Sequence, residues 1–228
     1  MENNITIIPT NVPQTRQSLF DATQIVSLFT DALHIDINDG VFAHPRTWPV
    51  LPEGAYESIV LPPIETHIHL MVEDIKTYGD MFASAGVHTV IVHAESYGAL
   101  ELLPQLMVAW KKKGVSQVGI AVQLGADVRD LIRHTTFGIV DFVLCMSVAH
   151  IGEQGSLFDT RVIENIRTFS HMCPDKEIAV DGGITAINIE SLVTAGARRF
   201  YIGSSIMRSV NPKDSYEQLL AIAKSALQ

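Results

Sequence analysis

Cysteine and long hydrophobic runs are scarce in this sequence. Among its 228 residues only Cys145 and Cys173 are cysteines, too few for the disulfide framework that stabilises small secreted domains. No apolar run approaches the roughly 18 residues that indicate a membrane span, and the first residues lack the basic region of a secretory signal. We therefore expect a reduced, cytoplasmic protein that has no membrane partner.

Blocks of like charge are also absent. The 16 Lys and Arg and 25 Asp and Glu residues give a net charge of −9, and these charges are dispersed along the chain. This distribution argues against nucleic acid as a partner. With 47% hydrophobic residues, the chain has enough apolar side chains for one sizeable core.

Short β-rich runs alternate with amphipathic runs along the chain. The predicted strands are 5–8, 32–37, 64–70, 89–93, 117–122, 142–146, 177–181 and 200–202. The predicted helices are 15–29, 73–85, 98–112, 126–134, 159–171, 187–195 and 214–226, with only a short helix near 53–60 in the proline-rich segment 41–63. Eight such units predict parallel strands joined by right-handed crossovers. We predict an α/β fold, a single (β/α)8 TIM barrel domain spanning residues 1–228.

His and Asp side chains recur near the ends of three predicted strands. His34 and Asp36 share one strand face, as do His67 and His69 on the next strand, and Asp181 ends a third strand. Each alone could be a hydrogen-bonded interior histidine or a capping aspartate. Because the C-terminal strand ends of a TIM barrel meet at one face, the full set favours a shared polar site that contains His34, Asp36, His69 and Asp181.

This set of side chains suits metal-assisted proton transfer. Two imidazoles and two carboxylates without a soft ligand fit one divalent transition ion, namely Zn²⁺, Fe²⁺, Mn²⁺ or Co²⁺. Such an ion polarises a carbonyl and stabilises an enediolate oxygen. Asp36 and Asp181, on different strands, could then flank a substrate as base and acid and invert a carbon centre.

Two glycine-containing loops point to an anionic group. Gly182 and Gly183 follow the seventh predicted strand, and Gly203 and Ser204 follow the eighth. Backbone N–H groups in such loops can converge on a phosphate. Tight turns between strands and helices also use glycine, so each loop alone is weak evidence.

The ordered motifs resemble those of the ribulose-phosphate 3-epimerase family. They are HIDINDG at 34–40, HLMV at 69–72, HAE at 93–95, MSV at 146–148, VDGGI at 180–184 and IGSSI at 202–206. The resemblance runs from about residue 5 to the C-terminal helix. It implies a metal-dependent barrel enzyme that interconverts ribulose 5-phosphate and xylulose 5-phosphate at C3.

The resemblance also implies roles for individual residues. The metal ligands would be His34, Asp36, His69 and Asp181, with Asp36 and Asp181 as the acid/base pair. The substrate-binding residues would be Thr10, Met71, Met146, Gly182, Gly183, Gly203 and Ser204. We expect a homo-oligomer whose partner is a small-molecule sugar phosphate.

The chain departs from the family pattern at several positions. Asn38 replaces a methionine, and His67 replaces an aspartate and is either a second-layer partner of the metal ligands or a core histidine. Residues 149–155 replace an Asn-Pro-Gly-Phe-Gly-Gly-Gln loop that closes over substrate. His44 and Arg46 also differ and are either solvated loop residues or contacts to a different sugar or a neighbouring subunit.

Two alternative functions remain open. A sugar-phosphate decarboxylase of the orotidine-decarboxylase type would need an Asp-x-Lys pair, but Asn38 stands two residues after Asp36. A non-catalytic sugar-phosphate-binding barrel is compatible with the altered 149–155 loop. The intact carboxylates argue against it, because buried charges without a function are costly.

Overall fold

The computed structural model describes residues 4–52, 55–152 and 155–227. Its strands pair in parallel and in sequence order, and β1 closes the sheet by pairing with β8. Their bounds are β1 Thr6–Asn11, β2 Ala32–Asn38, β3 Glu65–Met71, β4 Thr89–His93, β5 Gln117–Val122, β6 Phe142–Met146, β7 Glu177–Asp181 and β8 Arg199–Ile202. The predicted TIM barrel is confirmed.

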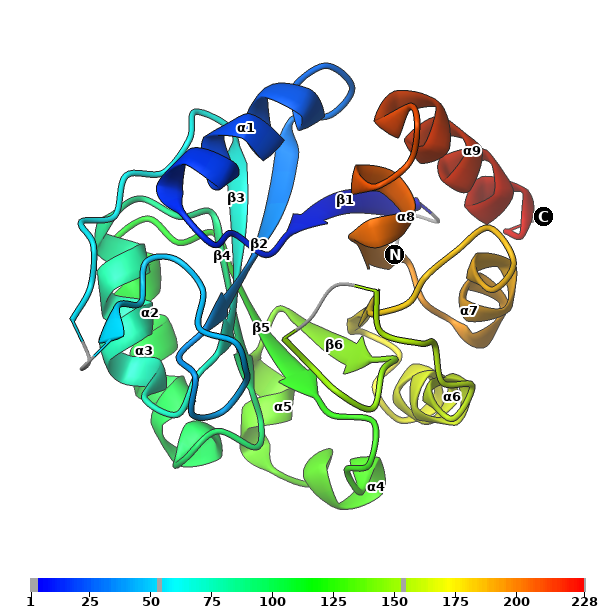
Figure 1. Ribbon diagram of the computed structural model, residues 1–228. Coiled ribbons are helices and arrows are strands. Elements are labelled where there is room, and N and C mark those ends of the chain that lie inside the picture. The colour runs from blue at the N-terminus through cyan, green and yellow to red at the C-terminus, as the bar shows by residue number, and fades with distance from the viewer. Residues whose placement is uncertain (1–3, 53–54, 153–154, 228) are drawn as a thin grey trace.

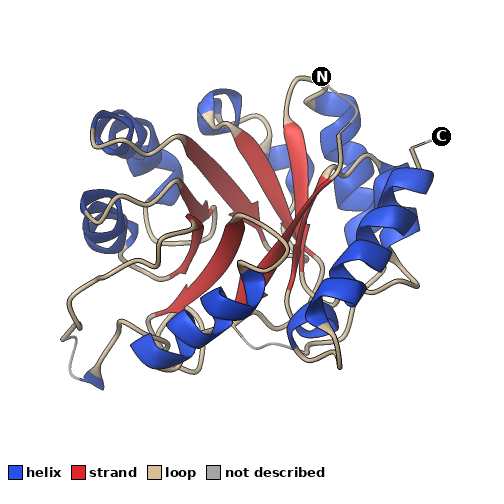
Figure 2. Cartoon of the chain, turned by 90° about the horizontal axis from the view of Figure 1, so that it is seen from above, coloured by secondary structure: helices blue, strands red, loops and turns tan. Residues whose placement is uncertain are grey.

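Helices surround this barrel on the outside (Figures 1 and 2). Their bounds are α1 Arg16–Val26, α2 Ile75–Ser84, α3 Ala99–Lys112, α4 Val128–Leu131, α5 Thr135–Ile139, α6 Val162–Met172, α7 Ile189–Ala195, α8 Ser204–Met207 and α9 Pro212–Ser225. The C-terminal helix α9 packs against β1 and α1, so the last helix lies beside the first strand and the first helix (Figure 1). In the described part of the chain, no helix is long and apolar enough to cross a membrane.

Two predicted helices were wrong. Within the expected helix 126–134 only Val128–Leu131 is helical, as α4. His134 has an extended backbone, and its side chain accepts a hydrogen bond from Thr136 N as the N-cap of α5, which begins at Thr135. The expected helix near 53–60 has its first two residues outside the described ranges, and 55–60 are not helical. There Tyr56 forms an antiparallel bridge with Val50 instead. Helix α8 was not predicted.

Side-chain alternation along the strands creates two apolar cores. On β2, Leu33, Ile35 and Ile37 point outward and pack in the core between strands and helices. A smaller core inside the barrel contains Ile8, Ile91, Ala121, Phe142, Leu144, Met146, Val148, Ala179 and Tyr201. The polar residues His34 and Asp36 also point inward, because successive strand side chains alternate between faces.

Candidate active site

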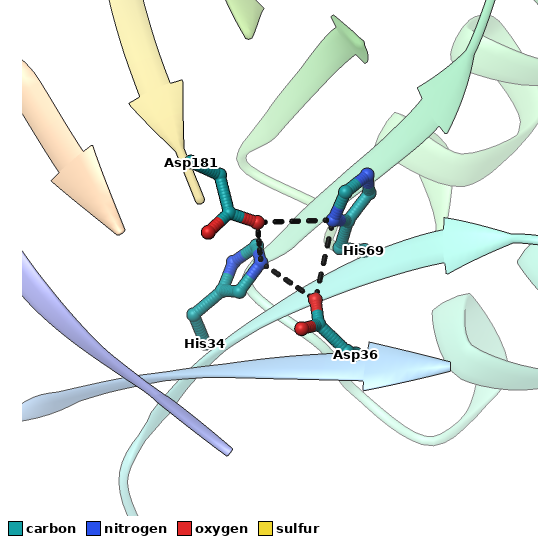
Figure 3. Close-up of side chains that lie close together, drawn as sticks. All are labelled: His34, Asp36, His69 and Asp181. Atoms are coloured by element: carbon teal, nitrogen blue, oxygen red, sulfur yellow. Dashed lines mark hydrogen bonds and ion pairs between the residues drawn. The ribbon is translucent and has the colours of Figure 1, made fainter. Parts of the chain in front are cut away.

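Four of the predicted site residues converge inside one end of the barrel (Figure 3). His34 and Asp36 come from β2, His69 from β3, and Asp181 ends β7. Asp36 pairs in register with His69 across the β2–β3 ladder. Residues that are distant in sequence therefore meet because their strands end at the same level.

Short distances connect the two imidazoles to the two carboxylates. The Nε2 atom of His34 lies 3.1 Å from Oδ1 of Asp36 and 3.8 Å from Oδ2 of Asp181. Nδ1 of His69 lies 3.2 Å and 3.6 Å from the same two oxygens. The four ligand atoms lie within 4.8 Å of one another, and all four residues are buried. One cation can contact all of them.

The His34 ring shows that this cluster is incomplete as a hydrogen-bonded network. Within the described residues, neither ring nitrogen of His34 makes a hydrogen bond, although the side chain is fully buried. Its ring lies against Tyr201, with centroids 4.0 Å apart, which holds Nε2 toward the carboxylates. A buried imidazole nitrogen that faces two carboxylate oxygens without a hydrogen bond fits a divalent metal ion.

The electrostatics of the cluster also favour a positive charge. Burial lowers the pKa of His69, but the carboxylates of Asp181 and Asp36 outweigh burial and raise it to about 9. Burial raises the pKa of Asp36, yet its contacts with His34 and His69 bring it below the ordinary value. The two carboxylates thus stabilise a cation between them, either a proton on His69 or a metal ion in its place.

His93 contacts His69 on the side of its ring opposite the two carboxylates, and Glu95 contacts His93. Nε2 of His69 lies 2.9 Å from Nε2 of His93, and Nδ1 of His93 lies 3.3 Å from Oε2 of Glu95. Burial lowers the pKa of His93 to about 4, although Glu95 acts in the opposite direction. A neutral His93 can accept a hydrogen bond from His69 Nε2–H and donate its own Nδ1–H to Glu95. When a metal ion takes the place of the proton on Nδ1 of His69, these hydrogen bonds keep the remaining ring proton on Nε2, and the Nδ1 lone pair is directed at the cluster.

Sequence reasoning included the HAE motif only as part of the resemblance and did not assign His93 or Glu95 a role. The available signal was the position of His93 at the end of β4, two residues after Ile91 on the inward face. Strand alternation places such a residue at the level of the site. The contact with His69 itself depends on the twist of β3 and β4.

A cavity that opens to solvent lies beside the four residues. All seven of the predicted substrate-binding residues line it: Thr10, Met71, Met146, Gly182, Gly183, Gly203 and Ser204. Asp36 and Asp181 line it as well. The carboxylates therefore face the same space as the glycine loops.

The glycine loop after β7 approaches its neighbours too closely for a side chain. Gly183 has φ +59, and a Cβ there would lie 2.7 Å from the backbone N of Phe158. The helix predicted at 187–195 is α7, which begins at Ile189 and not directly after Gly183. An Asn188-capped turn intervenes, in which Asn188 Oδ1 accepts from Thr185 N. The backbone of Gly182 and Gly183 therefore lines the cavity, and the N-terminus of α7 does not.

Asn38 joins two loops above the cavity. Its buried Nδ2 donates to Pro45 O and to Gly152 O, both at 2.9 Å. Gly152 has φ +96, and a Cβ there would lie 2.8 Å from His44 O. The residue that replaces the family methionine therefore connects the loop after β2 to the altered loop after β6. Residues 153–154 of that loop lie outside the described ranges.

The side chains at the remaining departures from the family pattern are not among the described residues that line the cavity. His44 and Arg46 are exposed, and Arg46 Nε donates to Asp39 O within its own loop. His67 is buried deeper in the barrel, where its ring nitrogens contact Tyr201 Oη at 3.1 Å and Glu65 Oε1 at 2.8 Å. It does not join the four clustered residues.

Comparisons with known proteins find related sequences along most of the chain. The profile of the ribulose-phosphate 3 epimerase family matches residues 6–207. The chain is 30% identical over 194 residues to ribulose-phosphate 3-epimerase of Bacillus subtilis, covering 83% of this chain and 85% of that protein. It is also 30% identical over 212 residues to the cytoplasmic isoform of Oryza sativa, covering 90% and 86%.

Solved structures with low sequence identity share the fold. 3-Hexulose-6-phosphate synthase from Salmonella typhimurium matches with a TM-score of 0.69 at 14% identity, covering 97% of this chain and 100% of that one. Orotidine 5'-monophosphate decarboxylase from Sulfolobus solfataricus matches with a TM-score of 0.60 at 12% identity, covering 99% and 100%.

Proposed function

Because this chain belongs to the ribulose-phosphate 3-epimerase family and is an isomerase that acts on carbohydrate phosphates, we propose that it interconverts ribulose 5-phosphate and xylulose 5-phosphate at C3. The observation that carries this proposal is the convergence of Asp36 and Asp181 at one cavity, with two histidines between them. Inversion at a carbon centre needs one proton-transfer group on each face, and this arrangement supplies two.

His34, Asp36, His69 and Asp181 would hold one divalent ion, Zn²⁺, Fe²⁺, Mn²⁺ or Co²⁺. When bound, that ion supplies positive charge for the oxygens of an enediolate. His93 and Glu95 hold the tautomer of His69 that has its Nδ1 lone pair directed at the centre. The ring of Tyr201 sets the orientation of His34.

Asp36 and Asp181 would carry the proton transfer. One carboxylate removes the proton at C3, and the other delivers a proton to the opposite face. Asp36 enters from β2 and Asp181 from β7, on opposite sides of the cluster (Figure 3). Met71 and Met146 would form the apolar walls beside the reacting carbons. Backbone groups of Gly182, Gly183, Gly203 and Ser204, with Thr10, would bind the rest of the sugar phosphate.

Isotope exchange tests the two-carboxylate mechanism. With ribulose 5-phosphate in D₂O, we expect deuterium at C3 of the product and at no other carbon, measured by NMR or mass spectrometry. Product without deuterium at C3 would argue against a solvent-exchanging acid/base pair. Substantial label at C1 would indicate aldose–ketose isomerisation instead. Binding of the sugar phosphate without any exchange would support the alternative of a non-catalytic barrel.

Substitution of either carboxylate complements that experiment. Asp36→Asn and Asp181→Asn should each lower kcat by about 10²- to 10⁴-fold, because each removes one proton-transfer group. Metal content is measured in parallel, since both side chains are also proposed ligands. Asp21→Asn, on the exposed face of α1, is the matched control and should retain wild-type activity.

The phosphoryl group is tested with unphosphorylated substrate. Contacts with a remote phosphate contribute binding energy that is used at the reacting centre. We therefore expect kcat/KM to be far lower for ribulose than for ribulose 5-phosphate. Equal values would point to a free-sugar epimerase and remove the proposed role of the glycine loops.

The decarboxylase alternative is disfavoured by the cavity itself. None of the described residues that line it is a lysine, and the amide of Asn38 is directed to loop carbonyls. A cytoplasmic location and a homo-oligomeric state remain predictions. Light scattering of the purified protein would check the second.

A further inference from the structure

A second group of potential metal ligands lies at the opposite end of the barrel. Glu65 is the first residue of β3, His67 follows two residues later, and His88 immediately precedes β4. One ligand atom from each of the three lies within 4.8 Å of the others. We call this group the N-terminal cluster. It shares no residue with the four side chains of the candidate active site.

We propose that the N-terminal cluster is a second binding site for a divalent transition ion such as Zn²⁺. Two histidines and one carboxylate are ligands that such ions prefer, and three protein ligands leave coordination positions for water. This proposal does not depend on the proposed epimerase activity, because it rests on different residues at a different end of the strands.

A single carboxylate oxygen lies between the two rings. Glu65 Oε1 is 2.8 Å from Nε2 of His67 and 3.3 Å from Nδ1 of His88. In the candidate active site, the corresponding nitrogen–oxygen distances run from 3.1 to 3.8 Å. The two clusters therefore have similar ligand spacing.

The ring nitrogen of His67 that faces away from Glu65 already has a hydrogen-bonding partner inside the barrel. Nδ1 lies 3.1 Å from Tyr201 Oη, which also accepts from Arg199 Nη1 at 3.5 Å. An ion at Nε2 places the ring proton on Nδ1, where it can donate to this hydroxyl. Metal-bound histidines are commonly held by such a second hydrogen bond. Arg199 itself is engaged by Glu177 at 2.6 Å.

His88 and the adjoining cavity allow an ion to enter. The His88 side chain is 36% exposed, so its ring can turn toward the ion, leaving its contact with Thr89 Oγ1. An open cavity at this end of the barrel is lined by Glu65, His67, His88 and Gln117. It supplies both a path from solvent and room for water ligands.

Direct Zn²⁺ binding tests the proposal. Purified protein is stripped of metal, titrated with Zn²⁺ against a chromophoric chelator, and analysed for metal after dialysis. In the titration, we expect His88→Ala and Glu65→Gln each to bind the second ion at least about 10-fold more weakly than wild type. After dialysis, each variant should therefore retain about one Zn²⁺ per chain fewer than wild type. His171→Ala, which removes an exposed histidine elsewhere, should bind as much as wild type.

Repeating the comparison in a His69→Ala background separates the two sites. His69→Ala disables the candidate active site, so loss of a further ion on adding His88→Ala would come from the N-terminal cluster alone. Circular dichroism identifies variants that fold. If the folded variants Glu65→Gln and His88→Ala bind the same number of Zn²⁺ ions as wild type, the proposal is overturned.

Discussion

At the scale of single residues, the geometry around His69 depends on a neighbour that does not face the cavity centre. Nε2 of His93 lies 2.9 Å from Nε2 of His69 and can accept a hydrogen bond from it, and Nδ1 of His93 contacts Glu95. Fixing the tautomer of a ligand in this way raises its affinity for metal. Loss of His93 should therefore disturb the orientation of His69, whereas loss of His69 removes the ligand itself.

His93→Ala should weaken binding of the active-site ion by about 10- to 100-fold. His69→Ala should lose that ion altogether, because it removes a ligand atom. His93→Gln, whose amide oxygen can accept the same hydrogen bond, should recover part of the affinity. Competition titration measures all three. Unchanged affinity in folded His93→Ala would show that His69 is oriented without its neighbour.

At the scale of elements, the loops after β2 and β6 are joined by one side chain. Asn38 Nδ2 bonds Pro45 O and Gly152 O, and its own backbone N donates to Thr47 Oγ1 at 2.8 Å. The position ends β2 and is fully buried. A leucine of similar volume has no amide N–H groups, so the carbonyl groups of Pro45 and Gly152 would lose these hydrogen bonds.

Asn38→Leu should lower the free energy of unfolding by about 1–3 kcal/mol, the cost of leaving buried polar groups unsatisfied. Urea denaturation measures the change. Asn165→Leu is the matched control, because Asn165 Nδ2 makes a single longer bond, 3.3 Å to Leu124 O, and is half-buried. Asn165→Leu should lower the free energy of unfolding by less than Asn38→Leu. Equal losses in both variants would remove the special role of the Asn38 contacts.

At the scale of the whole molecule, an ion at the active site would tie together strands that are distant along the chain. The proposed ligands come from β2, β3 and β7, and the unfolded chain has no such preformed site. Bound metal therefore stabilises the folded state by mass action.

Chelation should lower Tm. At an ion concentration of 100 Kd, binding contributes about 2.7 kcal/mol, which corresponds to roughly 5–10 °C for a domain of this size. Differential scanning calorimetry before and after metal removal measures the shift. His69→Ala should respond less, since it already lacks the active-site ion. An unchanged Tm after verified removal of metal would contradict the proposed ligand set.

The amino-acid sequence by itself determined the barrel and the level of the site. Strand alternation and the regular spacing of strands and helices are local patterns, so they predict the closed parallel sheet. The same alternation predicts that His34 and Asp36 share a face. Their convergence with His69 and Asp181 follows from the common end at which parallel strands terminate.

The tertiary structure alone decided features that depend on contacts between distant residues. Segment 126–134 has a helical pattern, but its helix α4 ends at Leu131, His134 is the N-cap of α5, and Thr136 Oγ1 donates to Leu100 O. The bonds of Asn38 and the contact of His93 with His69 require loops and strands to be in place. Hydrogen-bond direction and ring orientation are set by neighbours in space, which periodicity along the chain does not specify.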